Sequence, residues 1–258
     1  MKTIKIVKIG GNIINDEKTL NNFLANFAQL KGPKVLVHGG GKLASELASQ
    51  LNIPVTMIEG RRVTDTQTLD VITMVYAGKI NKQIVAQLQA HNTNTVGFTG
   101  ADGNTIVSVK RPVKPIDYGF AGDVVTVNPQ ILIVLINNEV TPVFCAITHD
   151  ANGQLLNTNA DTIASEIAIG LSAHFNTELY YCFEKSGVLT DIDNNDSVIE
   201  HINTETYTQL KTNGVIFEGM LPKLDNCFHV LQHNVHKVHI GNTDMVFNPT
   251  IKHTSLTL

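Results

Sequence analysis

Cysteine, positive charge and long apolar stretches are all scarce in this chain of 258 residues. Its three cysteines form no Cys-x-x-Cys pair and are odd in number, which suits core positions in a reducing compartment better than a disulfide framework. The 19 lysines and arginines are outnumbered by 23 aspartates and glutamates, so neither a nucleic acid nor a membrane surface is an expected partner. The apolar run from Ile131 to Ile136 is too short to span a bilayer. No cationic and apolar leader precedes the first apolar run, and we therefore expect a cytoplasmic protein that acts on small molecules.

The pattern of apolar residues predicts a globular α/β fold. Hydrophobic residues make up 43% of the chain, and short apolar runs alternate with segments of helical period, which is typical of βαβ units around a mainly parallel sheet. Strands are predicted near 4–9, 34–38, 94–98, 106–109, 124–127, 132–135, 142–144, 178–183 and 235–239. Helices are predicted near 17–30, 42–51, 66–91, 128–138, 160–172, 204–211 and 222–233.

The predicted helix 66–91 is long for a globular protein and carries two apolar faces. The second face, formed by Met74, Val75 and Tyr76, is either part of the core or a surface for self-association.

The stretch 107–127 interrupts this alternation. Its prolines and glycines suggest a β-hairpin laid over one end of the sheet.

Two glycine clusters are the most informative feature of the sequence. Lys8-Ile9-Gly10-Gly11-Asn12 and His38-Gly39-Gly40-Gly41-Lys42 each follow a predicted strand and precede a predicted helix, where backbone N–H groups gather and bind anions. Each alone could be an ordinary βα turn. Leu36 and Leu43 occupy positions that a nucleotide P-loop would fill with Gly and Ser or Thr, so the second cluster is not a P-loop. Neither cluster matches the dinucleotide-binding pattern.

Three further segments carry candidate chemistry. In Asn157-Thr158-Asn159-Ala160-Asp161-Thr162, either Asp161 or Thr162 could cap the next helix, or the carboxylate could hold neighbouring lysines. Pro222 suits a first helical turn, from which Lys223 would project, and a bound anion would explain a cation there, although a solvated surface lysine remains an alternative. An arginine of Gly60-Arg61-Arg62-Val63-Thr64-Asp65 could bind a substrate carboxylate.

Four histidines, at 229, 233, 236 and 239, have spacings reminiscent of a metal site. The first pair falls on a predicted helix and the second on a predicted strand, so the four side chains need not lie close together. No protein metal ligand is therefore expected.

Six motifs, taken together and in order, are far more specific than any one of them. They are Lys8-Ile9-Gly10-Gly11, Val37-His38-Gly39-Gly40-Gly41, Gly60-Arg61-Arg62-Val63-Thr64-Asp65, Asn157-Thr158-Asn159-Ala160-Asp161, Ser186-Gly187-Val188-Leu189 and Gly219-Met220-x-x-Lys223. Over nearly its full length the chain resembles the amino-acid kinase family. The Arg-Val-Thr and Asn-x-Asn-Ala-Asp blocks favour members acting on N-acetylglutamate over those acting on aspartate, glutamate, carbamate or nucleoside monophosphates.

The resemblance implies a three-layer αβα sandwich with a mainly parallel central sheet. It implies one domain over 1–258, with an acyl-amino-acid lobe over about 1–172 and a nucleotide lobe over about 173–258. The implied reaction transfers the γ-phosphoryl group of ATP to the side-chain carboxylate of N-acetyl-L-glutamate, a step of arginine biosynthesis. Mg²⁺ is expected to arrive with ATP, held mainly by phosphates and water.

Residue roles follow by matching the family's motifs. Lys8 and Lys223 would flank the transferred group as catalytic residues, and Asp161 would hold both lysines. Substrate binding would fall to Gly39, Gly40, Gly41, Arg62, Asn157 and Asn159. Phosphate and nucleotide binding would fall to Gly10, Gly11, Glu184, Ser186, Gly187, Val188, Leu189, Gly219 and Met220. Phe183-Glu184-Lys185 and Phe217-Glu218 depart from the family's usual residues where adenine and ribose would lie.

The resemblance also bears on assembly and on alternative functions. The extra N-terminal helix of the arginine-inhibited hexameric members is absent, which favours a homodimer through helix 66–91. The alternatives are the same chemistry on another N-acylglutamate, such as N-succinylglutamate, or a catalytically silent ligand-binding relative. The joint presence of Lys8, Asp161 and Lys223 argues against the silent relative.

Overall fold

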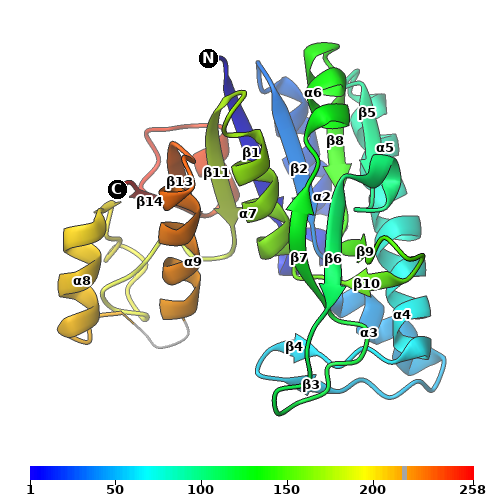
Figure 1. The fold of residues 1–258 in the computed structure, drawn as a ribbon. Coiled ribbons are helices and arrows are strands. Elements are labelled where there is room, and N and C mark those ends of the chain that lie inside the picture. Colours follow the sequence, from blue (N-terminus) through cyan, green and yellow to red (C-terminus); the bar gives the residue numbers. More distant parts are fainter. Residues whose placement is uncertain (217–219) are drawn as a thin grey trace.

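The central sheet forms the middle layer of the protein (Figure 1). The computed structural model describes residues 1–216 and 220–258, and within them this sheet has eight strands. In order across the sheet these are β12 (His201–Ile202), β14 (Thr254–Leu256), β13 (Lys237–Gly241), β11 (Asn176–Cys182), β1 (Thr3–Ile9), β2 (Lys34–His38), β8 (Thr141–Phe144) and β5 (Thr95–Phe98). Neighbouring strands are parallel except β13 and β14. The prediction of a mainly parallel sheet is confirmed.

Apolar strand sequences explain why this sheet is enclosed. Every residue of β2 is buried, as expected for a parallel strand covered on both faces. All three cysteines are buried and unpaired, as their scarcity predicted.

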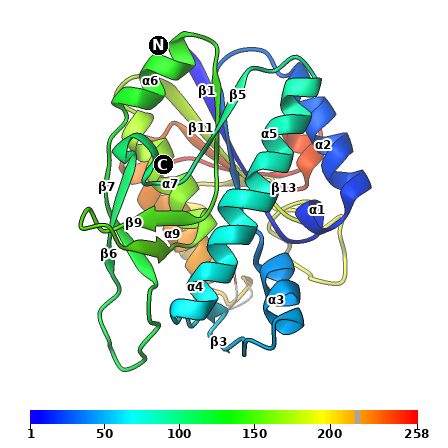
Figure 2. The same ribbon diagram turned by 90° about the vertical axis from the view of Figure 1, so that its right-hand side faces the viewer.

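Helices cover both faces of the sheet, which completes the predicted αβα sandwich (Figures 1 and 2). One face carries α7 (Ala160–Leu171) and α9 (Leu221–Gln232), and the other carries α2 (Glu17–Gln29) and α5 (Asn81–Ala90). The remaining α-helices of the described residues are α1 (Gly11–Asn15), α3 (Gly41–Gln50), α4 (Thr66–Thr73), α6 (Gln130–Asn137) and α8 (Thr204–Thr212). Short 3₁₀ turns, η2 and η3, span Asp102–Asn104 and Thr243–Val246. Within the described ranges, no helix has both the length and the apolar character to cross a membrane.

The long helix predicted at 66–91 is present as one continuous segment with a widened middle. Between α4 and α5 lies a π-helical stretch, η1 (Met74–Ile80). Such π turns occur often at functional sites. Of the second apolar face, Val75 and Tyr76 are buried and only Met74, at 53%, is exposed, so this face belongs mainly to the core.

The hairpin predicted within 107–127 is also present. Strands β6 (Ile106–Lys110) and β7 (Gly122–Val127) pair antiparallel and join β9 (Ile147–His149) and β10 (Leu155–Asn157) in a second sheet. A two-stranded ribbon, β3 (Met57–Ile58) and β4 (Arg61–Arg62), lies at the same end of the molecule (Figure 1).

The strand predicted at 132–135 is wrong, because these residues lie inside α6. Leu132 and Ile136, one turn apart, are buried, whereas Val134 is 56% exposed, so the apolar run packs through one helical face. The short elements β9, β10, β12, β14 and α1 were not predicted, since two to five residues are too few to show a period.

Candidate active site

Both glycine clusters lie at one edge of the central sheet. Strand β1 pairs with β2 on one side and with β11 on the other, so the order of strands along the chain reverses at β1. In open parallel sheets, ligands bind in the crevice beyond the carboxyl ends of the strands at such a reversal. The turns after β1 and β2 hold Gly10, Gly11 and Gly39–Gly41 at this place.

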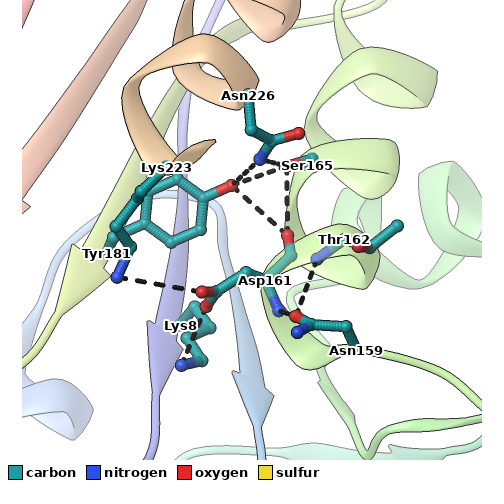
Figure 3. A network of polar contacts seen from close by, with 8 residues as sticks. All are labelled: Lys8, Asn159, Asp161, Thr162, Ser165, Tyr181, Lys223 and Asn226. Carbon is teal, nitrogen blue, oxygen red and sulfur yellow. Dashed lines mark hydrogen bonds and ion pairs between the residues drawn. The ribbon is translucent and has the colours of Figure 1, made fainter. Parts of the chain in front are cut away.

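Asp161 lies between the two lysines that the sequence singled out (Figure 3). Its Oδ1 is 2.8 Å from the Nζ of Lys8, and its Oδ2 is 3.8 Å from the Nζ of Lys223. Burial alone would raise the pKa of this carboxyl, but the charges of Lys8 and Lys223 outweigh burial and lower the pKa below its usual value. The arrangement therefore keeps one anion between two cations.

The helix cap of α7 leaves the Asp161 carboxylate available for this contact. Asn159 is the N-cap, and its Oδ1 accepts hydrogen bonds from the backbone N–H of Asp161 at 2.7 Å and of Thr162 at 3.4 Å. The alternative in which Asp161 or Thr162 caps the helix is therefore wrong. Lys8 comes from β1 and Lys223 from the first turn of α9.

The turn after β1 also contacts the C-terminal part of the chain. Gly11, with φ +47°, begins α1, and the side-chain amide of Asn12 donates a hydrogen bond to Glu184, which follows β11. Glu184 thus lies beside the glycine turn at 10–11.

The second glycine turn packs directly against the π-helical stretch. A Cβ on Gly40 would collide with Cδ1 of Ile80 and lie 2.9 Å from Cδ1 of Tyr76. Next to it, His38 is fully buried: its Nδ1 is 2.8 Å from the Gly39 carbonyl, and its Nε2 is 3.2 Å from the side-chain amide of Asn81. Burial lowers the pKa of His38 to about 4, so the imidazole is neutral.

A cavity of about 250 Å³ opens beside this turn. Predicted substrate-binding residues line it: Gly39, Gly40, Gly41, Arg62, Asn157 and Asn159. Asn157, at the end of β10, donates to the Thr64 hydroxyl at 3.0 Å. Tyr76 and Arg111 also line the cavity and were not predicted; Tyr76 was noted only as part of an apolar face.

Arg62 is one of three arginines that line this cavity, with Arg61 and Arg111. Its Nη2 donates to the Gly41 carbonyl at 2.9 Å and to the Ser45 hydroxyl at 2.8 Å. Its Nη1 is buried and has no hydrogen-bond partner among the described residues. Because buried donors are normally paired, a carboxylate ligand is the group that this nitrogen best fits.

The segment predicted to contact the nucleotide is partly core. Gly187, Val188 and Leu189 are buried, and the Val188 N–H donates to the Thr254 hydroxyl at 2.8 Å, which leaves Ser186 and Glu184 more accessible. Met220 is the N-cap of α9 and packs against the core, while Gly219 lies outside the described residues.

The four histidines do not converge. The rings of His229, on α9, and His233, at its C-cap, are tilted by 47°, with centroids 4.3 Å apart. His239 on β13 instead stacks on Tyr180 and contacts His253. In the part of the chain that the structure describes, no group of three or more His, Cys, Asp or Glu side chains could hold a metal ion.

Comparisons with known proteins show to which proteins the chain is similar. A model of the amino acid kinase family matches residues 3–242. The acetylglutamate kinase of Cytophaga hutchinsonii is 53% identical over 239 residues, covering 92% of this chain and 90% of the relative. That of Phocaeicola vulgatus is 52% identical over 235 residues, covering 91% of each. The crystal structure of smu.665 from Streptococcus mutans UA159 superposes with a TM-score of 0.76 at 24% identity, covering 98% of both chains, which shows a shared fold.

Proposed function

The chain belongs to the amino acid kinase family, and from this premise we propose that it phosphorylates the side-chain carboxylate of N-acetyl-L-glutamate with ATP, as the acetylglutamate kinases it resembles are named for doing. The product would be N-acetylglutamyl 5-phosphate, in a step of arginine biosynthesis. The single observation that carries the proposal is the Asp161 carboxylate between the ammonium groups of Lys8 and Lys223.

This arrangement supports phosphoryl transfer without an enzyme nucleophile. The substrate carboxylate attacks the γ-phosphorus, so the protein must align the two reactants and stabilise the negative charge that spreads over the transferred group. Lys8 would act on the attacking side and Lys223 on the leaving side, while Asp161 holds both cations in place. Backbone N–H groups of Gly10 and Gly11 would add donors to the phosphoryl oxygens.

Asp161 is already paired with two lysines, so it is not the carboxylate expected to ligate a metal. Mg²⁺ bound with ATP would neutralise phosphate charge, held mainly by phosphate oxygens and water.

The cavity beside Gly39–Gly41 would hold the acylated amino acid. The unpaired Nη1 of Arg62 supports a bidentate contact with the α-carboxylate, and the side-chain amide of Asn157, at the cavity wall, supports a contact with the amide of the substrate. Asn159 caps α7 and would contribute mainly by placing Asp161.

The nucleotide would lie on the C-terminal side of β1. The contact between Asn12 and Glu184 supports this placement, because it brings residues 184–189 to the glycine turn at 10–11. Glu184, Ser186, Gly187, Val188 and Leu189 are the residues proposed to meet it, together with Gly219 and with Met220, the N-cap of α9.

We further propose one domain with an acyl-amino-acid lobe over about 1–172 and a nucleotide lobe over about 173–258, acting in the cytoplasm as a homodimer through helix 66–91. Exposed Met74 on this helix supports the contact. Analytical ultracentrifugation of wild type and Met74→Glu tests it, since a dimer through this helix is expected to dissociate in the variant.

The decisive experiment presents the purified protein with MgATP and, one at a time, N-acetylglutamate, N-succinylglutamate, glutamate, aspartate and carbamate. ADP release is expected with N-acetylglutamate. ADP release with N-succinylglutamate alone would support the same phosphoryl transfer to a different acylated glutamate. The absence of ADP release with every acceptor would refute the proposed kinase activity.

Lys8→Ala and Lys223→Ala test the proposed roles. Each is expected to lower kcat far more than it raises either KM, because each lysine is proposed to act mainly in the transition state. An unchanged kcat in either variant would remove that lysine from catalysis.

A further inference from the structure

A buried polar network lies one helical turn behind the Asp161–Lys223 contact (Figure 3). The side-chain amide nitrogen of Asn226, on α9, is 2.9 Å from the Ser165 hydroxyl and 3.1 Å from the Tyr181 hydroxyl. These two hydroxyls are 2.5 Å apart. They lie 3.0 Å and 3.3 Å, respectively, from the main-chain carbonyl of Asp161.

The donors and acceptors of this network match. The Asn226 amide supplies two N–H donors, one for each hydroxyl. One hydroxyl then donates a hydrogen bond to the other hydroxyl, and the second donates a hydrogen bond to the main-chain carbonyl of Asp161. Burial raises the pKa of Tyr181 well above its usual value, so its hydroxyl stays protonated. Because both hydroxyls are buried and paired, they have one favoured arrangement.

The position of the network links it to the two charged side chains. Ser165 lies four residues after Asp161 on α7, and Asn226 lies three residues after Lys223 on α9, so each pair shares a helix face. Between the helices, the ring of Tyr181 on β11 lies 5.5 Å below the Lys223 ammonium, with Phe183 at 5.0 Å. The network therefore attaches α9 to α7 at the turn next to Lys223.

A second polar attachment of α9 leads elsewhere. Asp225, the neighbour of Asn226, accepts a hydrogen bond from the Tyr207 hydroxyl at 2.7 Å and lies 3.4 Å from Lys211, both on α8. This contact holds α9 to α8 without touching α7. The α9 helix thus allows a matched comparison between two polar contacts, that of Asn226 with Ser165 on α7 and that of Asp225 with α8.

We propose that Asn226 and Tyr181 are positioning residues, which fix α9 on α7 so that the Lys223 ammonium stays beside the Asp161 carboxylate. This inference rests on the proposed kinase function. The Lys223–Asp161 distance is 3.8 Å, against 2.8 Å for Lys8, so the ion pair of Lys223 is the weaker one and the position of its ammonium depends more on its helix.

Asn226→Ala and Tyr181→Phe test the proposal through steady-state kinetics with saturating MgATP. Each is expected to lower kcat by about ten- to a hundred-fold, the effect of misplacing a catalytic group by about 1 Å, with a small change in the N-acetylglutamate KM. Tyr181→Phe removes only the hydroxyl and keeps the ring beside Lys223, so the packing is preserved. This variant therefore still tests the proposal if Asn226→Ala does not fold. Asp225→Ala and Tyr207→Phe, which release only α8, are the controls and are expected to keep kcat.

A double-mutant cycle with Lys223→Ala separates positioning from general destabilisation. If the two residues act through Lys223, adding Asn226→Ala or Tyr181→Phe to Lys223→Ala lowers kcat little further. Additive losses, or losses equal to those of the α8 controls, would overturn the inference while the kinase activity of wild type stands. A wild type inactive toward every acceptor would instead overturn the proposed function and, with it, this inference.

Discussion

A Cβ atom on Gly10 would lie 2.9 Å from the Nζ of Lys8. The backbone of Gly10 is extended, with φ −164°, a conformation that any residue adopts, so the torsion angle does not require glycine here. What requires it is the lysine two residues earlier, whose ammonium passes over the unsubstituted Cα on its way to Asp161. The first glycine cluster thus makes room for the side chain of Lys8, for which we propose a catalytic role, as well as presenting backbone N–H groups.

Gly10→Ala is therefore expected to lower kcat by about tenfold or more, since the added methyl moves the Lys8 ammonium away from the transferred group. The thermal midpoint should change little, because the backbone conformation suits alanine. Initial rates of ADP release and a thermal melt measure the two effects. Gly78→Ala, where a Cβ meets open space, is the control and should keep kcat; equal rates in the two variants would contradict the steric explanation.

Arg62→Lys is expected to raise the KM for N-acetylglutamate by about ten- to a hundred-fold with a smaller change in kcat, because lysine keeps the charge but loses the fork that reaches Gly41, Ser45 and the ligand together. Substrate titrations at saturating MgATP give the KM. The KM for ATP should stay as in wild type.

Lys42→Ala provides the comparison for Arg62. Lys42 follows the same glycine turn but is exposed on α3, so its loss removes a nearby charge without touching the cavity. An unchanged KM in Arg62→Lys, or an equal rise in Lys42→Ala, would remove Arg62 from substrate binding.

Local sequence predicts those parts of the fold that have a clear period or a continuous apolar run. Strand β2 is buried throughout and β1 at its apolar residues, and these short apolar runs predict both strands. The helix at 66–90 shows its apolar stripe over many turns. The run in α6 is apolar enough to resemble a buried strand, and the sequence predicts both a strand at 132–135 and a helix at 128–138; the structure contains the helix, which buries Leu132 and Ile136. The π-helical stretch η1 coincides with Met74, Val75 and Tyr76, which form the second apolar face, but the period alone did not identify a π-helix there.

The residues of the candidate active site could not be grouped from their spacing in the sequence alone. Lys8 and Lys223 lie at opposite ends of the chain, and nothing local indicates that β1 and α9 meet at Asp161; the ordered motifs of the family provided that grouping. Asn226 and Tyr181 carried no signal at all, because their importance comes from a contact between three elements. Tertiary polar contacts of this kind become visible only once the sheet order is known.

The buried histidine beside the second glycine turn predicts a loss of stability in mild acid. Burial lowers the pKa of His38 from its usual 6.5 to about 4, so the unfolded chain binds a proton at a pH where the folded protein does not. The free energy of unfolding is therefore unaffected by this histidine well above pH 6.5 and declines as the pH falls toward 4, because protons then stabilise the unfolded chain. The slope from this group rises toward a maximum of about 1.4 kcal/mol per pH unit, which a full one-proton difference between the two states would give, and is about half of that at pH 6.5. Urea unfolding at several values between pH 6.5 and 5 measures it.

His38→Gln should flatten that slope, because glutamine does not titrate, whatever its cost to stability at pH 7. His91→Gln, at an exposed position, should leave the slope as in wild type. His239, whose pKa burial lowers to about 3, contributes a decline of the same sign, so some slope should remain in His38→Gln. A slope identical in wild type and His38→Gln would show that this imidazole is not buried as a neutral group.

Asp161→Asn is expected to lower kcat by more than about a hundredfold, because a neutral amide leaves the Lys8 and Lys223 ammoniums to repel each other and drift from the transferred group. The lowered pKa of Asp161 adds a second expectation: kcat of wild type should show no acid limb from this carboxyl down to pH 5, since it stays ionised there. Single-turnover rates from pH 8 to 5 test both. Asp70→Asn, on the exposed face of α4, should behave as wild type. An Asp161→Asn kcat within twofold of wild type would mean that the two lysines keep their positions without the anion between them.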